Sequence, residues 1–391
     1  MLKSYKYRIY LNNSQSRFIS KHFGCVRFIY NWALNKKIKL YETEKKSLSY
    51  FDLANELTIL KKDSQYEWLN EITAQSLQMS LRNLDVAFKR FFRLKTGFPK
   101  FKSKKNNYQS YQLPQNVSIN FETNKVKIPK IGLIKTKIDR QFTGKIKTCT
   151  ISRVPSGKFY ISILVDDEQN QIISKPKIQE STTLGADLGI TTFVTYSNGA
   201  KIENPKYLKK TLSQLKFQQR KLSRKQIDSN NRNKQRIVVA KLHEKVSNQR
   251  NDFLNKLSYT LTHEDQVESI ALETLDIKQM LQNKQLSQSI SDVSWSKFIS
   301  MLEYKSNWYN KNLIFIGKFE PSSKICSQCG TSNKNLKLSD RIWICNNCNI
   351  EHDRDINAAK NIKKFALQKQ NLIGMDHSKS TLAESSSLES Q

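Results

Sequence analysis

Three acidic residues stand at the boundaries of apolar segments that lie far apart in the chain. Asp187 ends Leu-Gly-Ala-Asp and is followed by Leu-Gly-Ile, Glu273 follows Ile-Ala-Leu, and Asp355 precedes Ile-Asn-Ala-Ala. Two divalent cations about 4 Å apart activate water and stabilise the leaving oxygen of a phosphodiester. Mg²⁺ and Mn²⁺ prefer oxygen ligands, so carboxylates suit this role. If the fold brings the three acids together, they form a metal site for cutting nucleic acid.

Each acid taken singly has a more ordinary interpretation. An Asp after a buried strand is usually a turn residue, a Glu after one is usually solvated, and an Asp before a helix usually caps it. The occurrence of all three in this order favours the metal site. Asp353 competes with Asp355 as the third ligand, and we expect Asp353 to cap the helix or support the site while Asp355 binds metal.

Four of the six cysteines form two pairs between the second and third acid. Cys326 and Cys329 are two residues apart, as are Cys345 and Cys348, and fifteen residues separate the pairs. Four thiolates at this spacing form two knuckles that close a tetrahedral Zn²⁺ site with no open position. The zinc is therefore expected to be structural, and His352 is not expected to be a ligand.

The same segment is a candidate surface for nucleic acid. Trp343 and the basic residues beside it suggest contact with nucleic acid, although a solvated face fits the pattern at least as well. The basic residues concerned are Lys324, Lys334, Lys337 and Arg341.

The net charge indicates a polyanionic partner. The 391 residues include 66 lysines and arginines against 34 acids, a formal charge of +32. Counterion release rewards each neutralised phosphate, so nucleic acid is the favoured partner and a membrane surface the alternative. We find no apolar run of about 18 residues and no signal peptide, and expect a cytoplasmic, nucleoid-associated protein. In a reducing compartment the paired cysteines indicate metal, and Cys25 and Cys149 are predicted to be buried.

Two basic stretches are candidates for nucleic-acid contact. Residues 88–108 contain no acid and interleave cations with aromatic rings, a pattern in which cations meet phosphates and rings meet bases. Phe88, Phe91 and Phe92 are assigned to a helical core instead. Residues 201–250 hold fifteen basic and three acidic residues, although such a run can be a solvated helix face. The predicted contacts are Lys89, Arg90, Arg93, Lys100, Lys102, Lys104, Lys105, Arg220 and Arg224.

Hydrophobic periodicity predicts the elements that position these residues. A strand opens the chain at residues 4–10, helices follow over 14–94, and strands return from residue 117. A hairpin is expected at 146–154 and 158–165, and these strands close a small barrel with the first.

A polar linker at 172–180 leads into the segments that carry the acids. Paired strands at 184–187 and 192–196 are typical of the start of an RNase H-like sheet. The later elements are expected at 205–263 (helical, broken near 228–231), 268–273 (strand), 294–309 (helix), 312–319 (strand) and 355–367 (helix). The serine-rich tail from Met375 lacks the apolar residues to order itself.

Together these motifs resemble the transposon-encoded TnpB (OrfB) proteins, relatives of the type V CRISPR nucleases, along nearly the whole chain. Asn349 departs from the family pattern, because a glycine often follows the last cysteine. The segments that carry the likeness are Tyr5-Lys6-Tyr7-Arg8, Arg27-Phe28-Ile29-Tyr30-Asn31, Ala87-Phe88, Phe91-Phe92, Gly97-Phe98-Pro99-Lys100-Phe101-Lys102, Gly185-Ala186-Asp187-Leu188-Gly189-Ile190, Glu203-Asn204-Pro205-Lys206-Tyr207, Leu242-His243-Glu244-Lys245, Asn248-Gln249-Arg250, Glu273-Thr274-Leu275, Pro321-Ser322-Ser323-Lys324, Cys326-Ser327, Cys329-Gly330, His352-Asp353-Arg354-Asp355 and Asn357-Ala358-Ala359.

The resemblance implies an RNA-guided DNA endonuclease encoded by an insertion-sequence-type transposon. A guide RNA from the transposon end would pair with one strand of double-stranded DNA, while the protein reads a short adjacent motif. Asp187, Glu273 and Asp355 match the family's Mg²⁺ (or Mn²⁺) triad, and the four cysteines match its Zn²⁺ ligands. We expect one protein molecule in the ribonucleoprotein.

The implied fold class is α+β multidomain, with a RuvC (RNase H-like) nuclease domain carrying an inserted zinc ribbon. A wedge β-barrel with a helical recognition insert precedes it. The expected boundaries are 1–12 and 113–180 for the OB-like wedge domain, 13–112 for the recognition domain, 181–320 and 351–370 for the nuclease domain, 321–350 for the zinc ribbon and 371–391 for a disordered tail.

Two other functions remain open from the sequence. A guided DNA-binding repressor with an inactive nuclease centre would fit the charge, but the presence of all three carboxylates argues against it. A strand-transfer transposase would join DNA ends, so cleavage without joined products would reject it.

Overall fold

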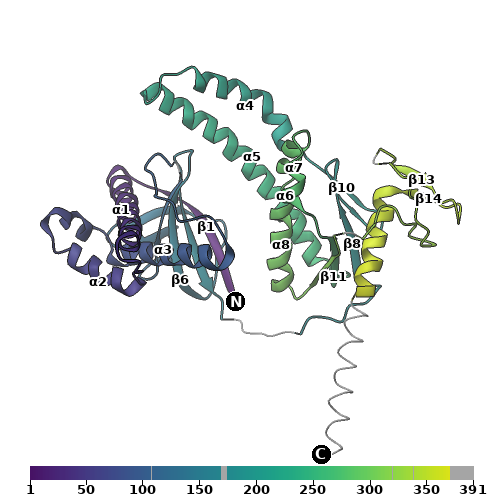
Figure 1. Cartoon of the computed structure of the whole chain (residues 1–391), viewed down its shortest axis with the longest axis horizontal. Coiled ribbons are helices and arrows are strands. Elements are labelled where there is room, and N and C mark those ends of the chain that lie inside the picture. Colours follow the sequence, from purple (N-terminus) through teal and green to yellow (C-terminus); the bar gives the residue numbers. More distant parts are fainter. Residues whose placement is uncertain (107, 169–173, 319, 338, 370–391) are drawn as a thin grey trace, which may run out of the picture. The chain divides into compact units, whose positions relative to one another are not determined.

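The chain forms two compact units, which Figure 1 displays in a computed structural model. One unit comprises residues 1–171 and 227–241, and the other comprises residues 172–226 and 242–391. The structure describes all residues except 107, 169–173, 319, 338 and 370–391, so the predicted disordered tail lies outside the described residues. Within the described ranges we find no helix that is long and apolar enough to cross a membrane.

An antiparallel seven-stranded sheet is the centre of the first unit. Its order is β2-β6-β7-β1-β5-β4-β3, so the first strand of the chain pairs with strands that follow the helices. The predicted hairpin is confirmed, because β6 and β7 pair over their length. Closure of this sheet into a barrel stays a prediction. The strands are β1 (Leu2–Tyr10), β2 (Gln109–Leu113), β3 (Ser118–Asn120), β4 (Lys125–Ile128), β5 (Gly132–Lys137), β6 (Lys145–Arg153) and β7 (Phe159–Asp166).

Helices occupy most of residues 13–94, as the sequence predicts, whereas the prediction of strands from residue 117 onward missed β2. A capping box starts the first helix: Asn12 Oδ1 accepts the N–H of Gln15 at 2.8 Å, and Gln15 Oε1 accepts the N–H of Asn12 at 3.2 Å. The buried faces of these helices share one hydrophobic core with the sheet. The helices are α1 (Asn13–Glu44), α2 (Tyr50–Leu60), the short 3₁₀ helix η1 (Ser64–Glu71) and α3 (Ala74–Leu94).

The end of α3 corrects one prediction. Phe88 packs against the core and Phe91 is half-buried, but Phe92 is 74% exposed. Leu84 is the last fully buried residue of α3. The turns after it lie at the edge of the hydrophobic core, so their side chains are at least partly exposed. Assigning Phe92 to the helical core was therefore wrong.

The second unit is built on a mixed five-stranded sheet of order β10-β9-β8-β11-β12. β8, β9 and β10 are antiparallel, whereas β8, β11 and β12 are parallel. The predicted strands are confirmed, and β10 is an additional one. The strands are β8 (Thr183–Leu188), β9 (Thr192–Tyr196), β10 (Lys201–Glu203), β11 (Ser269–Glu273) and β12 (Asn312–Ile316).

Helices cover both faces of this sheet. Successive residues of a strand point to opposite faces, and β11 follows this rule: Ile270 and Leu272 pack with α5 and α8, whereas Ala271 packs with the helix of residues 354–369. The predicted break in the long basic region separates α4 from α5. The helices are α4 (Tyr207–Ser223), α5 (Asn230–His263, of which residues 242–263 belong to this unit), α6 (Ile277–Met280), α7 (Ser287–Val293) and α8 (Trp295–Trp308).

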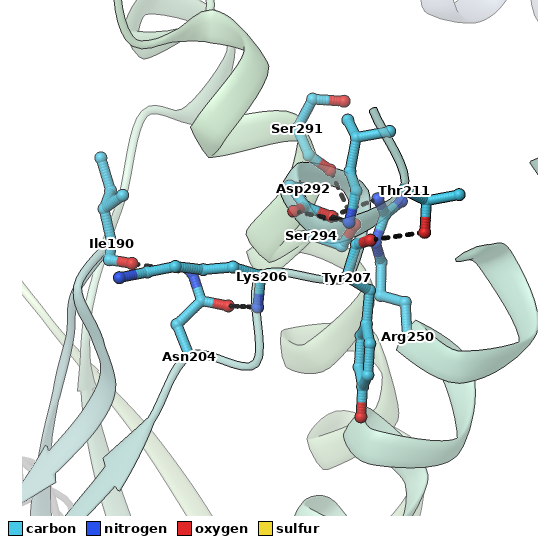
Figure 2. A network of polar contacts seen from close by, with 10 residues as sticks. Ile190, Asn204, Lys206, Tyr207, Thr211, Arg250, Ser291, Asp292 and Ser294 are labelled. Carbon is cyan, nitrogen blue, oxygen red and sulfur yellow. Dashed lines mark hydrogen bonds and ion pairs between the residues drawn. The ribbon is translucent and has the colours of Figure 1, made fainter. Parts of the chain in front are cut away.

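A polar network ties the loop after β8 to the helices (Figure 2). The side chain of Asn204 donates to the carbonyl oxygen of Ile190 at 2.7 Å and accepts the N–H of Lys206 at 3.1 Å. Asp292 of α7 accepts from the guanidinium of Arg250 at 2.6 Å and from the backbone N–H of Leu208. Two motif residues thus have structural roles: Asn204 holds the loop after β8, and Arg250 links α5 to α7.

Candidate active site

Asp187 lies near the carboxyl end of β8, where a tight turn begins. The N–H of Gly189 donates to the carbonyl oxygen of Phe193 at 3.2 Å. A Cβ atom on Gly189 would lie 2.6 Å from the carbonyl oxygen of Thr192, closer than real contacts allow. The turn therefore requires glycine, and this requirement fixes the backbone next to the Asp187 carboxylate.

A second glycine brings the helix of residues 354–369 onto the same strand. A Cβ atom on Gly185 would lie 2.1 Å from the carbonyl oxygen of Ala359, so helix and strand pack backbone against backbone. Asp355 is in the first turn of that helix. The close packing thus sets Asp355 beside the strand that carries Asp187.

Glu273 ends β11, the parallel neighbour of β8. Leu272 pairs with Ala186, and the next residues along the two strands are Glu273 and Asp187. Side chains at the carboxyl ends of adjacent parallel strands share one edge of the sheet, which is where open α/β sheets commonly bind ligands. The sheet register therefore places the two acids side by side.

The structure distinguishes Asp353 from Asp355. Asp353 Oδ1 accepts the backbone N–H groups of Asp355 and Ile356, both at 3.0 Å, and Oδ2 accepts from Lys201 Nζ at 2.6 Å. Burial alone would raise the pKa of Asp353, but Lys201 and the backbone N–H donors lower it overall. Asp353 is thus the helix cap, with both oxygens engaged, and Asp355 is left to face the pocket.

One pocket of about 580 Å³ contains all three acids. Its other walls come from the turn after β8, the segment that follows β12, and the zinc-binding segment. The lining residues are Asp187, Leu188, Gly189, Ile190, Thr191, Thr192, Glu273, Leu286, Glu320, Pro321, Ser322, Ser323, Lys324, Arg341, Arg354, Asp355 and Ala358.

The electrostatics of the pocket oppose the ionisation of its acids. Burial raises the pKa of Asp187 to about 7, and the charges of Asp355 and Glu273 add to this effect. Burial also raises the pKa of Glu273, with a further contribution from Glu320. Like charges held together in a shielded pocket are stabilised by a bound cation.

Basic side chains surround the acids but do not fill the pocket. Arg341 Nη1 lies 3.3 Å from Asp355 Oδ1, at the solvent-exposed side. Arg354 lowers the pKa of Asp187 in part, while its own Nη1 donates to the carbonyl oxygen of Lys337 at 2.7 Å. The oxygen-only donor set fits a hard divalent cation, and the guanidinium groups fit a phosphate beside it.

The four cysteines converge on one point. The sulfur atoms of Cys326, Cys329, Cys345 and Cys348 all lie within 4.8 Å of one another. Across the residues that the structure describes, no other set of three or more Cys, His, Asp or Glu side chains forms such a group. This set could hold a zinc ion, with no fifth side chain needed.

Asn349 replaces the expected glycine without breaking the knuckle. Its φ is 52°, in the left-handed region that asparagine tolerates better than most residues. Its N–H donates to the carbonyl oxygen of Cys345 at 2.9 Å.

The zinc-binding segment has its own small core. It contains the paired strands β13 (Ile342–Ile344) and β14 (Glu351–Asp353). His352 Nε2 lies 3.0 Å from Cys326 Sγ, and the ring of Trp343 lies 4.9 Å from that of His352. Trp343 is only 7% exposed, so it packs beside the cysteines and does not offer a stacking surface. Cys25 and Cys149 are buried, as predicted.

Two asparagines fasten the cysteine knuckle to the helix of residues 354–369. Asn357 accepts the N–H of Ser327 at 2.8 Å and donates to the carbonyl oxygen of Ile325 at 2.7 Å. Asn361 donates to the carbonyl oxygens of Ser322 and Ile325. The first turns of the Asp355 helix are therefore attached to the zinc-binding segment.

The nine predicted nucleic-acid contacts are all solvent-exposed. Lys89 is paired with Asp85 at 2.8 Å, and Lys102 lies over the ring of Tyr30. Asn31 holds the backbone of Lys102 through two hydrogen bonds. Their exposure is established for the full set Lys89, Arg90, Arg93, Lys100, Lys102, Lys104, Lys105, Arg220 and Arg224, and their role stays a prediction.

Sequence reasoning missed Glu320, an acid of the pocket, and did not foresee the contacts that Lys201, Asn204 and Arg341 make around it. Glu320 follows β12, the strand beside β11, so the search for acids after strands could have found it. Lys201 and Asn204 act through long-range contacts with Asp353 and Ile190, which no local pattern reveals. Arg341 was considered only as a surface cation, whereas it reaches Asp355.

Three family matches agree with these segments. Residues 160–284 match OrfB_IS605, described as "Probable transposase", and residues 295–362 match "Cas12f1-like, TNB domain". Residues 1–46 match HTH_OrfB_IS605, a "Helix-turn-helix domain"; in the structure they contain β1 and the single long helix α1.

Curated relatives span almost the whole chain. A Streptomyces pristinaespiralis protein named "Putative RNA-guided DNA endonuclease" is 35% identical over 366 residues, covering 92% of this chain and 88% of the relative. The Escherichia coli K12 protein "Putative RNA-guided DNA endonuclease InsQ" is 29% identical over 376 residues, covering 92% and 91%. Among solved structures, a Cas12f1-sgRNA-target DNA complex aligns with a TM-score of 0.55 and 13% identity over 93% of this chain and 98% of that chain. That likeness concerns the fold alone.

Proposed function

Because the chain belongs to the TnpB (OrfB) family, we propose that it is an RNA-guided endonuclease that cleaves double-stranded DNA with a two-metal site. On this proposal, an insertion-sequence-type transposon encodes the protein, and the guide RNA comes from the transposon end. The names of the full-length relatives support nuclease activity in general. The metal-dependent chemistry rests on this chain's own residues.

The observation that carries the proposal is the meeting of three carboxylates from separate elements in one pocket. Asp187 and Glu273 come from adjacent parallel strands, and Asp355 comes from the helix that packs on the first of them. Each acid has a common structural role when considered alone. Their shared pocket, with raised pKa values at Asp187 and Glu273, favours a metal-binding role.

The chemistry follows from the donor set. Two Mg²⁺ ions, when bound, would activate water and neutralise charge at the leaving oxygen. Asp187, Glu273 and Asp355 would hold these ions with carboxylate oxygens. Arg341 and Lys324 line the pocket as cations and would orient the scissile phosphate. Asn204 would steady the turn after Asp187 through its hydrogen bond to Ile190.

The domain assignment extends the proposal to the whole chain. We assign residues 181–320 and 351–370 to a RuvC nuclease domain, 321–350 to its zinc ribbon, 13–112 to guide and target recognition, and 1–12 with 113–180 to a wedge barrel. The strand order β10-β9-β8-β11-β12, three antiparallel and then parallel, supports the RNase H-like assignment. The nine exposed basic side chains would contact the nucleic-acid backbone.

Replacing Asp187 by Ala tests the proposal directly. The variant ribonucleoprotein should lose cleavage of a matched double-stranded DNA in Mg²⁺, because a metal ligand is removed, while retaining guide RNA in a pull-down. Asp265→Ala is a matched control, since Asp265 is an exposed acid of the same unit outside the pocket. Cleavage by Asp187→Ala at the control's rate would refute the active-site assignment.

The guide is tested separately by sequencing the RNA that copurifies with the protein from cells carrying its flanking DNA. A discrete RNA copied from the element's end is expected, and random cellular RNA would contradict the guided activity. Joined DNA products with a 3′-OH donor would instead indicate a strand-transfer transposase.

A further inference from the structure

Glu320 is a fourth carboxylate in the pocket of the three acids. It follows β12, and the β11 residue that pairs with the last residue of β12, Ile316, is Glu273. Glu320 lines the same pocket as Glu273. The segment after β12 thus brings a fourth acid to the pocket.

The Glu320 carboxylate has an unsatisfied oxygen. Oε2 is buried from solvent and has no hydrogen-bond partner within the described residues. Two of the cations near this segment are paired with other acids: Lys318 pairs with Asp276 at 2.8 Å, and Arg341 pairs with Asp355. A buried carboxylate oxygen without a donor is costly, and a divalent cation in the pocket would satisfy it.

Backbone contacts hold Glu320 in place independently of its carboxylate. Its N–H donates to the carbonyl oxygen of Gly317 at 3.5 Å, and its own carbonyl oxygen accepts the N–H of Ser322 at 2.8 Å. A Cβ atom on Gly317 would lie 3.0 Å from Glu320 Oε1, so the glycine leaves room for the carboxylate. Within the described residues, no hydrogen bond to Oε2 accounts for the burial of this oxygen.

We propose that Glu320 is a fourth metal-binding carboxylate of the nuclease site, sharing with Glu273 the cation on the β11–β12 side of the pocket. This inference rests on the proposed two-metal function. It adds to the triad an oxygen donor from the segment that leads into the zinc ribbon, so the start of that segment would form one wall of the metal site.

Metal affinity, measured apart from cleavage, is the decisive readout. Glu320→Gln keeps the side-chain volume and removes the charge, and Glu303→Gln is the matched control on the exposed face of α8. We expect Glu320→Gln to weaken Mn²⁺ binding to the zinc-loaded ribonucleoprotein by about tenfold or more in calorimetry. The Mg²⁺ concentration for half-maximal cleavage should rise by a similar factor, while Glu303→Gln matches the wild type.

Glu320→Asp sharpens the test because it keeps the charge but withdraws the oxygens by one methylene. An intermediate loss of Mn²⁺ affinity supports ligation. Wild-type Mn²⁺ affinity in both Glu320 variants overturns the inference, even if cleavage falls or the melting temperature drops.

The outcome for the wild type separates this inference from the proposed function. If the wild-type ribonucleoprotein neither binds Mn²⁺ at a site lost in Asp187→Ala nor cleaves DNA, the two-metal function fails. If it does both and Glu320→Gln behaves identically, only the role of Glu320 fails.

Discussion

The cysteine cluster and the acid pocket are two candidate metal sites in one unit, and they are built in opposite ways. The four sulfur atoms lie within 4.8 Å of one another, next to the buried Trp343 and His352. The acids instead line a pocket of about 580 Å³ together with arginine and lysine side chains. A closed ligand set suits a structural ion, whereas an open one leaves room for substrate.

The two sites are also joined. Asn357 and Asn361 bind the cysteine knuckle to the helix whose first turn carries Asp355. Arg341, which precedes β13, reaches Asp355. The closed site therefore stabilises one wall of the open site, and variants of each should have separable effects.

Glu273→Gln should give the largest effect on catalysis. The substitution removes a proposed metal ligand while keeping the side-chain volume, so DNA cleavage should fall by more than about 100-fold, beyond the loss typical for groups that only support a ligand. The melting temperature should not fall, because burial already disfavours the charged form of Glu273. Cleavage assays with purified ribonucleoprotein and thermal unfolding measure the two quantities. Activity within a few-fold of Glu303→Gln would remove Glu273 from the site.

Cys326→Ser should alter the cysteine site first and the acid pocket only indirectly. The closed site loses a thiolate, so the zinc content measured by mass spectrometry should fall below that of the wild type. Cleavage should fall by about 10- to 100-fold, because the knuckle bound by Asn357 loosens and this asparagine belongs to the Asp355 helix. Cys25→Ala is the control, since Cys25 is buried in the other unit. A zinc-free variant with full activity would show that the sites are independent.

Asp353→Ala and Asp355→Ala should have opposite signatures. Asp353 caps the helix and pairs with Lys201, so its loss should reduce the free energy of unfolding by about 1 kcal/mol and change cleavage only a few-fold. Asp355 is a proposed metal ligand, so Asp355→Ala should abolish cleavage. Because Asp355 makes no capping bond, this substitution should change the free energy of unfolding only slightly. Thermal unfolding and cleavage rates distinguish them, and exchanged signatures would make Asp353 the metal ligand.

The sequence predicted most of the strands and helices that carry these sites. It predicted few of the side-chain contacts that hold those elements together. β8 and β11 were found because short apolar runs end at acids, and the cysteine spacing marked the closed site directly. The contacts of Lys201 with Asp353 and of Asn204 with Ile190 bridge 152 and 14 residues, so no local period encodes them. Phe92 was misplaced because helical spacing does not reveal where a helix leaves the core.

The smallest expected effect is on the pH dependence of stability, compared between the wild type and a variant that lacks the Asp187 carboxylate. The pKa of Asp187 is about 7 in the folded chain and near its ordinary value of about 3.9 when unfolded. Between these values the folded protein retains a proton that the unfolded chain has lost, so stability falls as pH rises. Above pH 7 the free energy of unfolding lost by ionising Asp187 no longer changes with pH. Asp187→Asn has no ionisable group at this position and does not lose it.

Without added divalent cations, Asp187→Asn should therefore become more stable than the wild type as pH rises from about 5.5 to 7, by about 1 kcal/mol once partial solvation is considered. Melting temperatures of both proteins across this range, extended to pH 8, measure the difference. Mg²⁺ at pH 8 should then favour the wild type, because a ligand that binds the folded state stabilises it. Parallel pH curves would show that ionisation of Asp187 does not destabilise the folded chain.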